Sequence, residues 1–187
     1  MKKIFLFCTL AVMMCMVSCK GKNEPVDVNA KSLAKHWVGD ATEVNFYIEN
    51  ESGKTVMTPD EFATYLDEHK TLALMLGERY LPYIKQMSTL EITDITLKPD
   101  FTYSMTAKSG KSTKTAEGTW VELNDVLTIH VSLKDILGIE REGDMDMTVD
   151  KLTKTEIELS GIVPVLDADI TGIAAGGTFL FKGHAAE

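Results

Sequence analysis

Cysteine is nearly absent from this sequence and is confined to its beginning. The three cysteines among 187 residues are Cys8, Cys15 and Cys19. If the segment before Cys19 is removed, as argued below, one cysteine remains, and a lone modified thiol excludes an internal disulfide, a zinc–cysteine site and a cysteine nucleophile. The stability of the remaining chain must therefore come from burial of apolar side chains.

Positive charge is also in short supply. Lysine and arginine number 19 against 28 aspartates and glutamates, which gives a formal charge of −9. Loss of Lys2 and Lys3 with the leading segment would make the remainder more negative still. An acidic chain without a basic stripe is a poor ligand for nucleic acid and does not adsorb directly to anionic lipid. We therefore expect no nucleic-acid partner.

The familiar catalytic and cofactor motifs are missing. The sequence has no H-E-x-x-H or H-x-H spacing, no G-x-S-x-G, no P-loop and no dinucleotide fingerprint. Asp144, Asp146 and Asp150 resemble part of a calcium loop, but Val149 replaces the glycine and Thr155 the final glutamate. The four histidines are isolated in the sequence: His36, His69, His130 and His184. We expect no enzyme activity, no cofactor and no metal site.

The first residues have the layout of an export signal. Lys2 and Lys3 precede an uncharged run from Ile4 to Val17, which is shorter than the ~20 apolar residues of a membrane-spanning helix. The run ends at Ser18-Cys19, which resembles the lipobox of bacterial lipoprotein precursors, although Met16 replaces the usual leucine. We expect residues 1–18 to be a signal peptide and Cys19 to carry the lipid. The alternative is an ordinary signal peptide with incidental cysteines.

Residues 19–30 are expected to form a lipidated, flexible tether, because they are polar and have no hydrophobic period. Residues 31–187 then form one domain, which begins with a short helical turn over Ser32–Trp37, capped by Ser32. The predicted membrane partner is reached through the lipid on Cys19. Because Lys20 is not an aspartate that retains lipoproteins at the inner membrane, we place the protein at the outer membrane of the cell envelope.

Most of the domain has a period of two, which is typical of half-buried strands. In residues 90–97 the apolar parity changes between Ile92 and Ile95, which indicates a β-bulge. Short turns such as Lys98–Asp100 and Asn124-Asp125 separate the strands. An up-and-down meander of this length closes into a barrel, since closure removes its edges. The eight strands predicted are 42–49, 89–97, 101–107, 113–122, 126–133, 145–151, 155–162 and 177–183, with an irregular stretch over 161–177.

One segment, 59–87, is predicted to be helical and lies between the first and second strands. Thr58 to Glu61 forms a capping box with Pro59 at the first helical position. A second helical run starts at Thr71, and Pro82 is expected to kink or restart it. The fold class is therefore all-β with a helical insertion.

Several short motifs carry a resemblance to a known family. Leu33 and Trp37 precede the first strand, Asp100-Phe101-Thr102-Tyr103 starts another, and Gly118-Thr119-Trp120 runs through 123–127 into the next. These resemble the lipocalin-like domain of small lipoproteins of Gram-negative cell envelopes, with Lys35 where the opening glycine of that family stands. The resemblance covers roughly residues 31–184. It implies an eight-stranded antiparallel barrel, often with a cavity for a small apolar molecule.

Two functions remain open. In the first, the barrel binds a small apolar or amphipathic ligand beneath a helical cap; in the second, it is packed solid and acts through its surface as an accessory subunit, an adhesion module or an inhibitor of a secreted enzyme. An eight-stranded interior can do either. Phe101 and the two tryptophans are also expected inside, the tryptophans as structural plugs. The candidate ligand-binding residues are Phe46, Ile48, Tyr65, Tyr80, Tyr103, Met105, Trp120, Met147 and Phe181.

Overall fold

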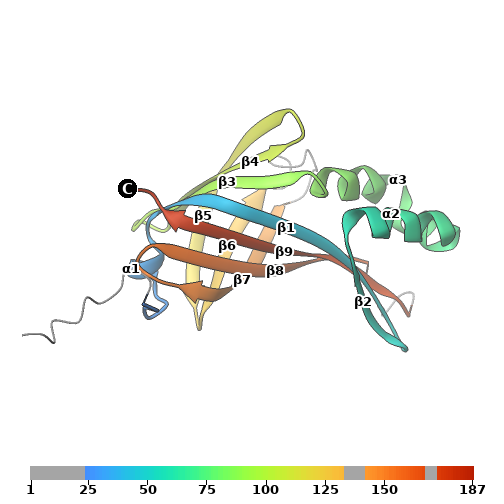
Figure 1. Cartoon of the computed structure of the whole chain (residues 1–187), viewed down its shortest axis with the longest axis horizontal. Helices are drawn as coiled ribbons and strands as arrows, with labels where there is room; N and C mark the ends of the chain where they lie inside the picture. The colour runs from blue at the N-terminus through green and yellow to red at the C-terminus, as the bar shows by residue number, and fades with distance from the viewer. Residues whose placement is uncertain (1–23, 133–141, 167–171) are drawn as a thin grey trace, which may run out of the picture.

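The computed structural model describes residues 24–132, 142–166 and 172–187. The expected signal peptide, Cys19 and the side chain of Tyr80 lie outside the described part. Eight strands form a closed, antiparallel, up-and-down barrel (Figure 1), in which each strand pairs with the next and β1 pairs with β9. The barrel strands are β1 (His36–Asn50), β3 (Leu90–Leu97), β4 (Thr102–Ser109), β5 (Ser112–Leu123), β6 (Val126–Ser132), β7 (Glu142–Leu152), β8 (Glu156–Leu166) and β9 (Ala174–Ala185).

All eight predicted strands are present, but their ends differ from the prediction, for example in β1, β8 and β9. β1 begins six residues early, at His36, and so includes Trp37. β8 and β9 extend into the stretch 161–177 that we predicted to be irregular, because their ladder continues from Ile162↔Thr178 to Leu166↔Ala175. Alanine and glycine dominate the start of β9, and residues so small provide no alternation of polarity from which a strand can be predicted.

One further strand, β2 (Gly53–Met57), was not predicted. It forms a hairpin with the second half of β1, from Asn50↔Gly53 to Phe46↔Met57. The first half of β1 pairs on the same edge with β3, through three residue pairs only. Beyond them the two strands diverge, and the hydroxyl of Thr42 accepts a hydrogen bond from the Ile92 amide at 2.9 Å. β1 is therefore shared between the barrel and a hairpin that projects past its end (Figure 1).

Two helices, α2 (Pro59–Glu68) and α3 (Lys70–Met87), follow β2 and lead into β3. The predicted capping box is confirmed. The Thr58 hydroxyl accepts from the Glu61 amide, while the Glu61 carboxylate accepts from the Thr58 amide at 2.8 Å. The hydrogen bonds from the backbone and hydroxyl of Thr58 lower the pKa of Glu61. Pro82 was expected to kink or restart the helix, and it does not restart it, because α3 is continuous from Lys70 to Met87. An internal proline removes one N–H···O bond, and this loss need not end a helix. The break between the helices lies at His69.

The short helix at the start of the domain, α1 (Ala30–Leu33), begins earlier than predicted. Its N-cap is Asn29, whose side chain accepts from the Ser32 amide at 3.0 Å. Ser32 completes the capping box by accepting from the Asn29 amide. Either residue type can cap a helix, and only the backbone decides which one stands at the boundary.

The bulge predicted between Ile92 and Ile95 is confirmed as a register shift between Ile92 and Asp94 in the β3–β4 ladder. It keeps Ile92 and Ile95 both buried although they are three residues apart. The bulge bends β3 at the point where it leaves β1.

Gly118 gives a stability test of the motif that precedes Trp120. A Cβ atom at Gly118 would lie 2.5 Å from the His130 carbonyl oxygen and 2.9 Å from the Tyr103 ring. We predict that Gly118→Ala lowers the free energy of unfolding by about 1–3 kcal/mol, as overpacking does. Gly143→Ala is the matched control, because a Cβ there meets nothing within 4 Å, and its effect should stay within about 0.5 kcal/mol. Urea unfolding measures both, and equal effects would refute the steric explanation.

Candidate functional site

The barrel interior is the first candidate site. Seven of the nine predicted ligand-binding residues lie there, and their exposed fractions range from 0% to 3%. Almost none of their surface is therefore in contact with water. They belong to a single continuous apolar cluster. The seven are Phe46, Ile48, Tyr103, Met105, Trp120, Met147 and Phe181.

The two remaining predicted residues lie in the helical layer. Tyr65 is half-buried at the rim, where its ring stacks on His69 of the same segment, with ring centroids 3.9 Å apart. The side chain of Tyr80 is not among those described. The structure therefore brings seven predicted residues together, but as a packed interior.

The two helices lie at the open end of the barrel, where the β1–β2 hairpin projects (Figure 1). Phe62 of α2 stacks on Phe46 of β1, with ring centroids 4.8 Å apart. The buried residues of both helices join the same cluster as the barrel interior. The described apolar side chains of the helices are therefore continuous with the barrel core. The helix residues in the cluster are Phe62, Leu66, Leu72, Leu76, Ile84 and Met87.

Tyr47 lies on the opposite face of β1 from these helices. Its ring covers Gly176 of β9, where a Cβ would lie 2.6 Å from the ring. The ammonium group of Lys54, which lies on β2, is 3.9 Å from the centroid of the Tyr47 ring. Burial, and secondarily the charge of Glu49, raises the pKa of the Tyr47 hydroxyl. The projecting hairpin is thus fixed to the barrel on both faces.

The other end of the barrel, which we call the closed end, is plugged by two tryptophans, as predicted. Trp37 donates its indole N–H to the Leu33 carbonyl at 2.9 Å, and Trp120 donates to the Lys98 carbonyl at 3.1 Å. Both side chains are at most 1% exposed. The prediction that Phe101 points inward is wrong. It lies in the turn before β4 with φ of 64° and is 48% exposed, because the strand begins one residue later than predicted.

The N-terminal segment is attached at the closed end rather than free. Pro25 forms a bridge with Thr153, and the Val26 amide donates to the Leu152 carbonyl at 3.0 Å. Residues 25–30, which the sequence suggested were part of a flexible tether, therefore lie against the barrel. The reason is that Val26 and Val28 pack on the core, which composition alone did not reveal.

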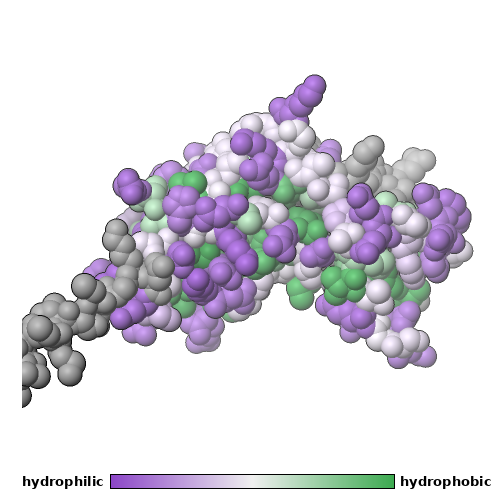
Figure 2. Space-filling view, in the orientation of Figure 1, coloured by the Kyte–Doolittle hydropathy of each residue, from purple (hydrophilic) through white to green (hydrophobic). Residues whose placement is uncertain are grey.

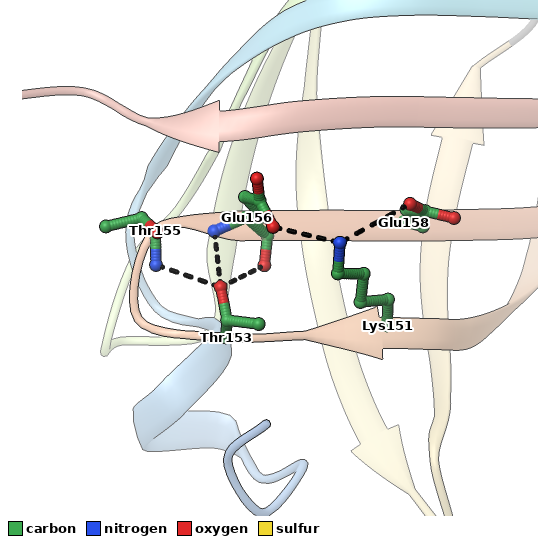
Figure 3. Close-up of polar contacts among 5 residues, drawn as sticks. All are labelled: Lys151, Thr153, Thr155, Glu156 and Glu158. Carbon is green, nitrogen blue, oxygen red and sulfur yellow. Dashed lines mark hydrogen bonds and ion pairs between the residues drawn. The ribbon is translucent and has the colours of Figure 1, made fainter. Parts of the chain in front are cut away.

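Thr153 organises the turn that receives this segment (Figure 3). Its side chain is fully buried, and its hydroxyl accepts from the amides of Thr155 at 3.2 Å and Glu156 at 2.8 Å. Outside the turn, Lys151 donates to the Glu156 carboxylate at 2.9 Å, and this hydrogen bond raises the pKa of the Lys151 amine. The turn is therefore held by side chains as well as by the strand ladder.

Two surface hollows are lined by described residues. One of about 220 Å³ lies between the end of α3 and the β4–β5 turn, with Lys108, Lys114 and Ser109 in its wall. The other, of about 450 Å³, lies at the closed end between α1, Pro99 and Trp120. Neither reaches the residues predicted to bind a ligand, apart from Trp120.

The histidines do not converge. Three of them lie half-exposed on the barrel exterior, each beside one carboxylate. The fourth, His69, stacks on the ring of Tyr65. The three pairs are His36–Asp94 at 3.9 Å, His130–Asp144 at 2.9 Å and His184–Asp40 at 2.7 Å. Among the described side chains, no group of three His, Cys, Asp or Glu is placed to hold a metal ion. No helix in the described part of the chain is both long and apolar enough to span a membrane.

The geometry defines a class of protein: an eight-stranded, antiparallel, closed β-barrel with helices across one end, which is compatible with a lipocalin-like fold. Comparisons with family models, with curated proteins and with solved structures find no match for the chain. The function must therefore be inferred from the barrel itself.

Thr153 provides a test of the closed-end turn. We predict that Thr153→Val, which keeps the shape but removes the acceptor for two amides, lowers the free energy of unfolding by about 1–3 kcal/mol. Trypsin should also cut faster at Lys31 and Lys35, since the N-terminal segment depends on this turn. Thr148→Val, on the exposed face of β7, is the control for the substitution itself. Equal unfolding curves for the two variants would contradict the role of Thr153.

Proposed function

We propose that this chain is a lipid-anchored protein of the bacterial cell envelope whose solid barrel is a rigid base for binding another protein. This is the second of the two functions that the sequence left open. The observation that supports it is the exposed fraction of 0–3% at the seven interior residues, which belong to one continuous apolar cluster.

The exposed apolar side chains suggest where a partner binds. Three of the large ones lie at the open end, on β2 and at the start of α3: Val56, Leu74 and Met75. Figure 2 shows hydrophobic surface below this helical end, bordered by hydrophilic side chains. β2 also has no strand on its outer edge within the described residues. Apolar side chains with a polar border are typical of protein-binding surfaces.

The anchor is proposed from the lipobox-like sequence at Ser18-Cys19. Several acyl chains on one cysteine would hold the protein stably, whereas a single chain would be marginal. The acidic charge of the domain makes any other attachment weak. The outer membrane remains our proposed location, because the residue after Cys19 is Lys20 and not the aspartate that retains lipoproteins at the inner membrane.

We predict that Cys19→Ser leaves the barrel folded but moves the protein from the membrane fraction to the soluble fraction. The reason is that Cys19 would be the only residue carrying lipid, and it lies outside the packed domain. Fractionation after incorporation of labelled palmitate measures the release and the loss of lipid, and thermal unfolding of the soluble protein checks the barrel. Ser18→Gly is the control, because it keeps a small residue before the cysteine. Recovery of the Cys19→Ser protein in the membrane would refute the anchor.

The solid interior gives a second prediction. The Cys19→Ser protein should appear in native mass spectrometry without an adduct and should show no thermal shift with lipids, isoprenoids or benzene. Met105→Ala is the positive control, because removing a buried side chain opens an apolar cavity that can bind a small apolar probe. An adduct retained by the protein with Met105 intact would establish the ligand-binding function instead.

A further inference from the structure

We propose that the closed end of the barrel docks on the membrane, with Phe101, Val121 and Leu123 entering the headgroup layer. These three residues are called the closed-end patch below. The inference rests on the proposed lipid anchor at Cys19 and adds to it an orientation and a second, non-covalent contact. The partner that this patch contacts is the surface of a phospholipid bilayer.

The first argument is the length of the tether. The chain is fixed to the barrel from Pro25 onward, through the bridge to Thr153 and the hydrogen bond of Val26. Six residue steps separate Cys19 from Pro25, so the two lie at most ~20 Å apart. β1 runs 15 residues from the closed end to the tip of the hairpin, a length of roughly 50 Å. The anchor can therefore hold the closed end at the bilayer but cannot bring the tip of the hairpin there.

The second argument is the position of the exposed apolar side chains. Phe101, Val121 and Leu123 are 48%, 55% and 70% exposed. The Phe101 carbonyl accepts from the Trp120 amide at 2.9 Å, so Phe101 lies beside the start of this row. Val121 and Leu123 follow on the outer face of β5, about 7 Å apart. The three side chains thus lie at the same rim of the barrel, where the tether begins.

The groove at the closed end connects this patch with the N-terminal segment. It holds about 450 Å³ and is lined by Ala30, Lys31, Ala34, Pro99 and Trp120. Its wall is mostly apolar, and it lies between α1 and the turn that carries Phe101. A surface that combines an apolar groove, an exposed ring and a nearby lipid anchor matches the boundary between headgroups and acyl chains.

Phe101 is poorly suited to its backbone conformation. Its φ of 64° lies in the left-handed region, which favours glycine or asparagine over a bulky residue. Half of its ring packs on Trp120, with ring centroids 5.4 Å apart, and the other half faces solvent. Packing in the barrel accounts for the inner half of the ring. Insertion at a membrane interface, where aromatic rings are enriched, accounts for the outer half.

Charge does not drive the docking. The lysines Lys31, Lys35, Lys98 and Lys154 lie at this end, and the acidic residues Asp27, Asp100, Glu122 and Asp125 offset them in number. Apolar insertion must therefore supply the attraction. A short tether holds the patch at an effective concentration of about millimolar, so that a weak intrinsic affinity is sufficient.

The scarcity of cysteine makes a direct test possible. Once Cys19 is lipidated, a new cysteine is the only free thiol of the mature chain and can carry an environment-sensitive fluorophore. The purified lipidated protein is placed in vesicles of phosphatidylethanolamine and phosphatidylglycerol, with the label at Lys98→Cys or, as the open-end control, at Ser52→Cys. We expect the label at position 98 to be blue-shifted and to lose most of its quenching by iodide, while the label at 52 is quenched as in solution.

Patch variants identify the residues responsible. Phe101→Asn suits the left-handed backbone and, with Leu123→Ser, should restore quenching at position 98 while the protein still floats with the vesicles. The matched control is Val56→Thr with Leu74→Ser, which removes exposed apolar groups from the open end and should leave the protection unchanged. Thermal unfolding of both double variants checks that the barrel is intact.

Each other outcome overturns the inference in a different way. Equal quenching at 98 and 52 in protein that floats with the vesicles refutes docking and leaves the anchor in place. Protein that does not float refutes the anchor and docking together. Protection that rises with the protein-to-lipid ratio identifies a second copy of the chain as the occupant. Protection that survives in the patch variant shows that other residues make the contact.

Discussion

The pairing of β1 with β9 is the interaction on which the rest of the structure depends. It joins twelve residue pairs, from Trp37↔Ala185 to Glu49↔Ala174, and turns an open meander into a barrel. Without it, both outer strands would expose unpaired amides and carbonyls, and the apolar interior would face water along the gap. Closure therefore satisfies the backbone and shields the core at the same time.

The same pairing explains why the two ends of the barrel differ. β1 is held along its whole length by β9, so its other edge can be divided between β3 and β2. The division leaves a fork at the open end, which α2 and α3 cover with their apolar faces. At the closed end, three tight turns and two tryptophans leave no such opening, and the N-terminal segment attaches there. One end thus becomes the helical end with exposed apolar groups, and the other becomes the attachment point of the tether.

Much of the fold could be predicted from local sequence, and the misses share a cause. Alternating polarity located eight strands, the parity change located the bulge after Ile92, and Thr58-Pro59-Asp60-Glu61 located the start of α2. β2 was missed because Lys54, Thr55 and Val56 are all exposed and show no alternation. The inward position of Phe101 was wrong because this residue lies in the turn before β4, where its φ of 64° removes it from the alternation of the strand. Each wrong prediction concerns a place where the alternation of buried and exposed side chains does not determine the local structure.

The sequence by itself determined the fold class and the acidic character of the chain, because these follow from composition and periodicity. It also supplied the list of large side chains that face inward, since period two distinguishes the two faces of a strand. Only the tertiary structure decided that these side chains are buried together in one cluster and that residues 25–30 lie against the barrel. Both depend on distances between segments far apart in the chain, and no local pattern encodes whether the space between opposite walls is empty or filled.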